Sequence, residues 1–257
     1  MSLSILLERS VLKLGEPIRG EIRGESPINA RLFVILSSLL FPGAGSVAKT
    51  FTIYSEHYFL RPGHFEITYP KGLPPSVSGR ANRVRWSLLF GKPRMGGRFF
   101  YPRREVRLKV FPERPTRKEE PWVEFDKDYY RSDEVVRALL KRPVEVGKAL
   151  VELEAEEWLS YRGERREVRY HLSDGTLRSE GGRLLAEATL PHDPTTVQDV
   201  TFFFPYTFSF LSEDLSFGSR VNMVLTTPEG ERRAEVPVWP GEPRYRRGEA
   251  RREPPPT

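Results

Sequence analysis

The second half of this chain repeats the first, and that repeat constrains the fold more than any other feature. Four pairs of segments align: residues 15–22 with 133–140, 65–70 with 201–206, 83–88 with 220–225, and 106–112 with 234–240. The last pair closes each half with a strand-like segment ending in Phe-Pro or Trp-Pro. A duplicated block of this length predicts two similar domains in tandem, each of roughly 110–120 residues and large enough to bury a core.

Both halves have a pattern typical of β-strands. Runs of Val, Ile, Leu, Phe and Tyr recur about every ten residues between clusters of Pro, Gly, Asn and Asp. The predicted strands are residues 4–14, 17–23, 31–40, 50–54, 64–69, 84–90 and 106–110, and then 134–140, 149–154, 168–172, 184–190, 200–204, 221–226 and 234–238. This spacing predicts all-β sandwiches. Residues 133–141 and 149–159 are rich in helix formers. The first of these is the repeat partner of a strand, so we predict a strand there.

Proline and charge mark the boundary between the halves. Residues 111–121, FPERPTRKEEP, hold three prolines and six charges, which a central strand cannot accommodate. The predicted organisation is an N-terminal sandwich over residues 1–112, a semi-rigid connector over 113–121, a C-terminal sandwich over 122–242 and a disordered Arg- and Pro-rich tail over 243–257. The tail leaves open a weak contact with an anionic partner or membrane surface.

Composition excludes several classes of function. The chain has no cysteine, so disulfides, thiolate metal sites and thiol nucleophiles are excluded. No apolar run is long enough to span a membrane, and we see no signal peptide, which favours the cytoplasm. The net charge is +6, but basic and acidic residues alternate, which indicates a salt-bridged surface rather than a nucleic-acid footprint. The excess of Arg over Lys is typical of a heat-adapted protein or of a GC-rich genome.

Three features together resemble a known family. The chain opens with an apolar strand, a Gly15-Glu16 turn and a second strand. Residues 65–76 then end in Leu73-Pro74-Pro75-Ser76 and precede the strand Val84-Arg85-Trp86-Ser87-Leu88. With the tandem repeat, these features are similar to the arrestin-like family, whose fold is two immunoglobulin-like β-sandwiches. The resemblance covers roughly residues 3–240 and is strongest at 11–22 and 65–90.

The resemblance implies an adaptor rather than an enzyme. The family includes visual and β-arrestins, α-arrestins, a retromer cargo subunit and bacterial sporulation-control proteins, and the short chain is closest in style to the bacterial members. Members hold receptors, cargo or signalling partners. The buried charged cluster of classical arrestins cannot be located in this sequence, and no tail with paired phenylalanines is found, so phosphoreceptor binding is not carried over. The apolar residues of the matching strands are read first as core.

One segment comes close to a phosphate-binding loop. From Gly43 to Thr50 the sequence nearly matches G-x-x-x-x-G-K-[ST]. The second glycine is replaced by Ala48, whose Cβ would keep the backbone from wrapping phosphates. A true phosphate loop is followed by a helix, whereas residues 51–54 read as a strand. A hairpin loop is therefore the preferred interpretation, and nucleotide binding stays as the alternative.

No other set of residues predicts catalysis. The four histidines, His57, His64, His171 and His192, lack metal-ligand spacing, and no G-x-S-x-G motif is present. Glu154, Glu156 and Glu157 offer a carboxylate pair, but such clusters are usually solvent faces, and Arg162 and Arg165 are close enough to pair with them. We therefore expect no metal and no cofactor.

An aromatic run supplies the one candidate binding site. From residue 202 to residue 210 the sequence is FFFPYTFSF, and Pro205 should end the first strand. Phe208 and Phe210 are then expected in a loop, where an exposed ring would contact a protein partner. The leading hypothesis is a non-enzymatic cytoplasmic adaptor that binds a protein through a sheet edge or the groove between domains. The alternatives are nucleotide binding at residues 43–50 and peripheral membrane binding by the basic tail.

Overall fold

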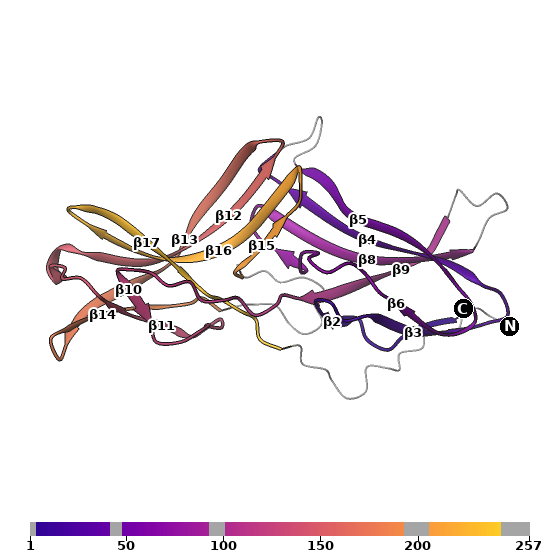
Figure 1. The fold of residues 1–257 in the computed structure, drawn as a ribbon, viewed down its shortest axis with the longest axis horizontal. Helices are drawn as coiled ribbons and strands as arrows, with labels where there is room; N and C mark the ends of the chain where they lie inside the picture. Colours follow the sequence, from indigo (N-terminus) through magenta and orange to yellow (C-terminus); the bar gives the residue numbers. More distant parts are fainter. Residues whose placement is uncertain (1–3, 42–47, 93–100, 193–205, 243–257) are drawn as a thin grey trace.

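The chain is built from β-strands, as predicted (Figure 1). The structure is a computed structural model, and it describes residues 4–41, 48–92, 101–192 and 206–242. Within these ranges the only helical element is the single 3-10 turn Val146–Lys148. Alternation of apolar and polar residues produces the strands: in β4 (Ile28–Ser38) every second side chain is buried, from Ile28 to Ser38. Such period-two burial places one face of a strand on a core.

The first half forms two sheets. The smaller has the order β1 (Ser4–Leu7), β3 (Ile18–Arg23), β6 (Gly63–Ile67). The larger has the order β2 (Val11–Lys13), β9 (Tyr101–Phe111), β8 (Asn82–Lys92), β4, β5 (Lys49–Leu60), and the short β7 (Val77–Ser78) also pairs with β8. All pairs are antiparallel except β2 with β9.

The second half repeats this arrangement. One side has the order β10 (Val123–Phe125), β11 (Val135–Leu140), β14 (Arg183–Thr189). The other has the order β13 (Glu164–Glu180), β12 (Leu150–Tyr161), β16 (Leu215–Thr227), with β15 (Phe208–Leu211) and β17 (Gly230–Val236) both on β16. The long β13 pairs first with β12 and then with β14, so it joins the two sides into one eight-stranded sheet.

The repeat extends to individual hydrogen bonds. In the first half Glu16 accepts the backbone N–H of Lys13 at 3.0 Å, and in the second half Glu134 accepts that of Arg131 at 3.0 Å. The residue before each glutamate has a positive φ, 83° at Gly15 and 65° at Asp133. Two turns of the same build therefore precede β3 and β11, as the alignment of residues 15–22 with 133–140 predicts.

One aligned pair of the sequence repeat is out of register. Ser76 Oγ accepts the N–H of Val110 at 3.0 Å, and Thr207 Oγ1 accepts the N–H of Val238 at 3.0 Å. The segment around Ser76 is thus the counterpart of the segment around Thr207, whereas residues 65–67 lie on β6, whose counterpart by strand order is β14. At Tyr206 the alignment of 65–70 with 201–206 is therefore out of register, and residues 201–205 lie outside the described part of the chain.

Most predicted strands are present, with differences in length and one difference in kind. The helix formers in residues 149–159 lie in β12, and β11 confirms the strand predicted at 134–140. β5 and β13 are longer than predicted. The loop predicted for Phe208 and Phe210 is wrong, because both lie in β15, which begins three residues after Pro205. The predicted strand at 200–204 and the tail at 243–257 lie outside the described residues.

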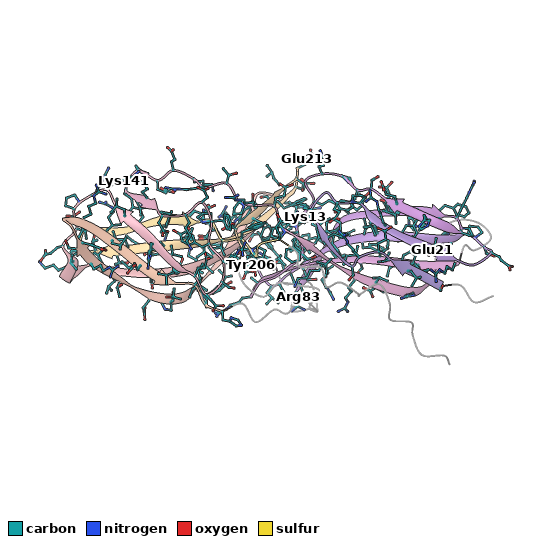
Figure 2. All side chains as sticks on the ribbon, turned by 90° about the horizontal axis from the view of Figure 1, so that it is seen from below. Lys13, Glu21, Arg83, Lys141, Tyr206 and Glu213 are labelled. Atoms are coloured by element: carbon teal, nitrogen blue, oxygen red, sulfur yellow. The ribbon has the colours of Figure 1, made fainter. Side chains whose placement is uncertain are left out.

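Two hydrophobic cores lie along the molecule, and one of them takes residues from both halves. The second core is built from residues between Trp122 and Val238. The first core contains the apolar face of residues 5–110, but also four side chains from the second half: Leu159, Phe210, Leu215 and Phe217. In the view of Figure 2, Glu21 lies towards one end of the molecule, Lys141 towards the other, and Lys13 and Tyr206 between them.

Candidate functional site

The two halves meet where strands of the second half extend over the first. Tyr161, at the end of β12, makes edge-to-face contacts with Phe51 at 5.0 Å and Phe41 at 6.2 Å between ring centroids. Arg166 donates to the backbone carbonyl of Leu40 at 3.0 Å and lies over the Phe41 ring. Packing of this kind buries aromatic area from both halves and resists their separation.

A buried carboxylate then joins the halves through hydrogen bonds. Glu157, 1% exposed, accepts the backbone N–H groups of Arg80 at 2.6 Å, Ala81 at 3.0 Å and Asn82 at 2.8 Å. Glu157 also accepts a hydrogen bond from the Tyr170 hydroxyl of its own half, at 2.9 Å. Consecutive backbone N–H groups form a natural anion-binding concavity, so the loop before β8 holds this carboxylate as a ligand. We call this contact the Glu157 latch.

Two neighbouring residues fit the Glu157 latch closely. A Cβ at Gly79 would overlap the Glu157 carboxylate, so only glycine leaves room for it. Burial raises the pKa of the Tyr170 hydroxyl, and the negative charge of Glu157 raises it further. Tyr170 therefore remains a hydrogen-bond donor at neutral pH. The Arg80 guanidinium lies 4.2 Å from the centroid of the Tyr170 ring.

An open cleft of about 490 Å³ lies between the halves beside this junction. Leu73 and Pro75 of the first half, residues 112–116 and Lys118 of the connector, and residues of β12, β13, β15, β16 and β17 line it. We call it the interdomain cleft. The connector is held in place here, because Trp239 Nε1 donates to the carbonyl of Pro112 at 3.1 Å and Lys118 pairs with Glu235 at 2.7 Å.

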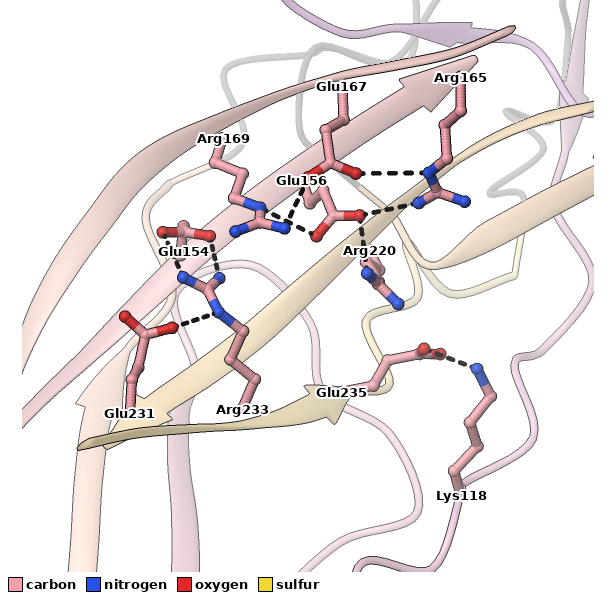
Figure 3. Close-up of polar contacts among 10 residues, drawn as sticks. All are labelled: Lys118, Glu154, Glu156, Arg165, Glu167, Arg169, Arg220, Glu231, Arg233 and Glu235. Carbon is pink, nitrogen blue, oxygen red and sulfur yellow. Dashed lines mark hydrogen bonds and ion pairs between the residues drawn. The ribbon is translucent and has the colours of Figure 1, made fainter. Parts of the chain in front are cut away.

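An arginine network, drawn in Figure 3, lies beside the interdomain cleft, and two of its members, Arg165 and Arg220, line the cleft. Glu156, fully buried, pairs with Arg220 at 2.7 Å, Arg165 at 3.3 Å and Arg169 at 3.4 Å. Glu167 pairs with both Arg165 and Arg169. A buried charge is stable only when it is paired and hydrogen-bonded, and the three guanidiniums from β13 and β16 meet that need. Nearby, Arg233 pairs with Glu154 and Glu231.

An aromatic ring lies beside this network. Trp158 is the register partner of Gly218, and a Cβ at Gly218 would press against the Trp158 ring. The glycine therefore lets the indole lie close over β16. The guanidinium of Arg165 lies 4.8 Å from the centroid of the Trp158 ring, within the range of a cation–π contact.

The glutamates predicted as a solvent face are mostly buried. Glu156 and Glu157 point to opposite faces of β12 and have different partners, so they form no carboxylate pair. The predicted pairing with Arg165 is confirmed for Glu156. Arg162 instead lies over the ring of Tyr161, at 5.2 Å from its centroid. These carboxylates are engaged in hydrogen bonds and ion pairs within the fold.

The phosphate-loop candidate continues as a strand. Residues 43–47 lie outside the described part of the chain, whereas Lys49 and Thr50 begin β5. The ammonium of Lys49 lies 4.1 Å from the centroid of the Tyr161 ring, in the junction between the halves. The helix that would hold a phosphate is thus replaced by a strand, as the sequence predicts.

The histidines fall into separate places. His57 lies on β5, where burial and then the charge of Arg31 lower its pKa, and His64 lies on β6. His192 contacts Asp133 at 2.7 Å. His171 contacts Glu152 through Nδ1 at 3.1 Å and Asp174 through Nε2 at 3.5 Å. Glu152 is half-buried and the other two residues are exposed, and one ligand atom from each of the three lies within 4.8 Å of the others, so this cluster could hold a metal ion, which was not predicted from the sequence.

The two candidate partner-binding rings belong to the first core. Phe210 is 9% exposed and packs on Phe217 at 5.2 Å between ring centroids. Phe208 is half-buried, contacts Phe217 edge to face and lines the interdomain cleft. Their neighbour Leu211, 83% exposed, is the apolar side chain of β15 that faces solvent. The partner-binding role of Phe208 and Phe210 stays a prediction.

Sequence reasoning missed the residues that join the halves. The Glu157 latch combines residues 79–82 with residue 157, and no local spacing connects them. The only sequence signal is that Glu157 takes an apolar position of an alternating strand, in line with Val151, Leu153 and Ala155, which is unusual for a buried face. Such a buried polar residue calls for a partner.

Two comparisons with known proteins gave no match. A scan against protein-family models found no match, and a search of curated proteins found none either. Among the residues that the structure describes, there is no helix of the length and apolarity needed to cross a bilayer.

Proposed function

We propose that this protein is a non-enzymatic adaptor of the cytoplasm, made of two arrestin-like, immunoglobulin-like sandwiches, that binds a protein partner by strand addition. The repeated strand order of the two halves supports the two-sandwich interpretation. The buried glutamates described above are taken up in hydrogen bonds and ion pairs within the fold, which supports a binding role rather than catalysis.

The observation that carries the proposal is the free edge of β5. This strand spans 12 residues and pairs only with β4 among the described residues. An edge strand offers a row of backbone N–H and C=O groups to an extended segment of another chain. Phe59 on this strand is 60% exposed, so it supplies an apolar contact next to the open edge.

Proline substitution tests the edge directly, because proline cannot donate a backbone hydrogen bond. The adjacent residues Glu56 and His57 direct their N–H groups alternately towards β4 and away from it. Of the variants Glu56→Pro and His57→Pro, one loses an N–H that points away from β4 and should abolish binding of a captured partner with little loss of stability. The other loses an N–H that points towards β4 and should lower stability. Unchanged partner affinity in both variants would exclude strand addition at β5.

A further inference from the structure

Two acidic side chains face each other across β12 and β13, with an imidazole beside them. Glu152 and Asp174 are register partners in this antiparallel pair, so both side chains lie on one face of the sheet. Like charges directly opposite each other on neighbouring strands destabilise a sheet. Within the described residues neither carboxylate is paired with a lysine or an arginine, and the ionisable group that each contacts is His171. The pair therefore lacks a permanent positive charge to balance it.

The next acidic residue on the same face of β12 is neutralised within the fold. Glu154, two residues further along the strand, pairs with Arg233 of β17. Arg233 also pairs with Glu231, so two carboxylates already share its charge. No guanidinium or ammonium among the described residues does the same for Glu152 and Asp174. A cation from solution is the group that would neutralise them.

A β-bulge brings the imidazole to the same face as the two carboxylates. The register of the two strands shifts so that Leu172 has no partner on β12. His171 and Asp174 are three residues apart, so they would point to opposite faces of a regular strand. The extra residue re-aims one of them, and both are exposed. As a result His171 Nδ1 lies 3.1 Å from Glu152 Oε2, and Nε2 lies 3.5 Å from Asp174 Oδ1.

The three side chains supply the ligand atoms of a divalent transition-metal ion. One imidazole nitrogen and two carboxylate oxygens lie within 4.8 Å of one another. Zn²⁺ binds such atoms at about 2.0–2.2 Å, so the side chains must rotate to close around an ion. The side chains of Asp174 and His171 are 94% and 50% exposed, which leaves room for that rotation. An imidazole ligand favours Zn²⁺ over Ca²⁺ and Mg²⁺, which take oxygen ligands.

We propose that Glu152, His171 and Asp174 bind a divalent transition-metal ion of the Zn²⁺ type. The ion neutralises the two facing carboxylates and ties β12 to β13 at the bulge. Three protein ligands leave the fourth tetrahedral position to water or to a ligand atom of another molecule. The site lies in the second half, whereas β5 lies in the first, so it stands or falls independently of strand addition.

Isothermal titration calorimetry of the full, untagged chain, freed of metal by a chelator, tests the proposal. The two probes are zinc chloride and calcium chloride. We expect one Zn²⁺ to bind per chain, at least about tenfold more tightly than Ca²⁺, because imidazole suits Zn²⁺ and Ca²⁺ takes oxygen ligands. Zn²⁺ should also raise the midpoint of thermal unfolding, since the ion binds the folded arrangement of the two strands.

Variants locate the ion. His171→Gln and Asp174→Asn should each weaken Zn²⁺ binding by about tenfold or more. The matched control is His192→Gln, because His192 also contacts a carboxylate, that of Asp133 at 2.7 Å, but lies outside the cluster; it should leave Zn²⁺ binding unchanged. Circular dichroism melts confirm that each variant folds. The proposal is overturned by no binding at about 0.1 mM Zn²⁺, by equal binding of Ca²⁺, by variants of His171 and Asp174 that bind like the parent, or by an equal loss in His192→Gln.

Discussion

Replacing Glu157 with glutamine should uncouple the two halves of the molecule. The side chain keeps its size, but one carboxylate oxygen becomes an NH2 group. That group then faces the N–H of Arg80 and the hydroxyl of Tyr170, or the N–H groups of Ala81 and Asn82, depending on the amide orientation. In either orientation, at least one backbone donor meets another donor.

The size of the effect follows from the hydrogen bonds lost. A hydrogen bond to a charged group contributes about 1.5–3 kcal/mol, and a buried unsatisfied donor costs about 1–3 kcal/mol. Glutamine retains two acceptor contacts in weaker, neutral form, so we expect a loss of about 2–4 kcal/mol. Alanine leaves three backbone N–H groups without the carboxylate and should cost about 3–5 kcal/mol.

Urea unfolding monitored by tryptophan fluorescence measures the loss. With a slope of about 3 kcal/mol per molar, a loss of 3 kcal/mol lowers the midpoint by about 1 M. The matched control is Glu164→Gln, an exposed glutamate that pairs with Arg166, which should cost less than about 1 kcal/mol. If the free energy of unfolding of Glu157→Gln lies within about 0.5 kcal/mol of that of the parent, the Glu157 latch contributes nothing to stability and the reasoning fails.

Three further changes address the Glu157 latch and the arginine network beside it. Gly79→Ala should cost about 2–4 kcal/mol in urea unfolding, because its Cβ displaces the Glu157 carboxylate; a loss below about 1 kcal/mol would contradict the packing. Because the pKa of the Tyr170 hydroxyl is raised in the folded state, the stability that it contributes is fully present below about pH 10 and is lost as pH rises. Between pH 9 and pH 11 the parent should therefore lose about 1.4 kcal/mol more stability than Tyr170→Phe. An equal decline in parent and variant would refute this. Glu156→Gln should cost about 3–5 kcal/mol and lower the thermal midpoint, because three arginines lose their shared carboxylate.

The sequence predicts local features of the fold well. Alternating apolar residues locate β4, and the Gly15-Glu16 and Asp133-Glu134 turns mark the start of equivalent strands in both halves. These features depend on residues that are close in the chain, so a local sequence pattern is enough to predict them. The alignment of 65–70 with 201–206 is out of register at Tyr206, because aromatic residues suit many strands and carry little information on register.

The junction between the halves could not be predicted in the same way. Phe210 belongs to the core of the first half, although it is more than 140 residues from most of that core in sequence. The latch depends on the approach of the loop before β8 to β12, and the interdomain cleft depends on the position of the connector. Both are consequences of packing between distant strands, for which one sequence holds no periodic signal.

We expect the contacts of the Glu157 latch to hold the two halves in one fixed arrangement. Because the chain has no cysteine, two can be introduced and spin-labelled specifically, one at Glu25 in the first half and one at Asp174 in the second, both exposed. Pulsed electron–electron double resonance measures the distance between the two spin labels. It should give one narrow distance distribution in the parent chain and a broad one in Glu157→Ala. A broad distribution in the parent, or the same narrow distribution in both, would contradict the account.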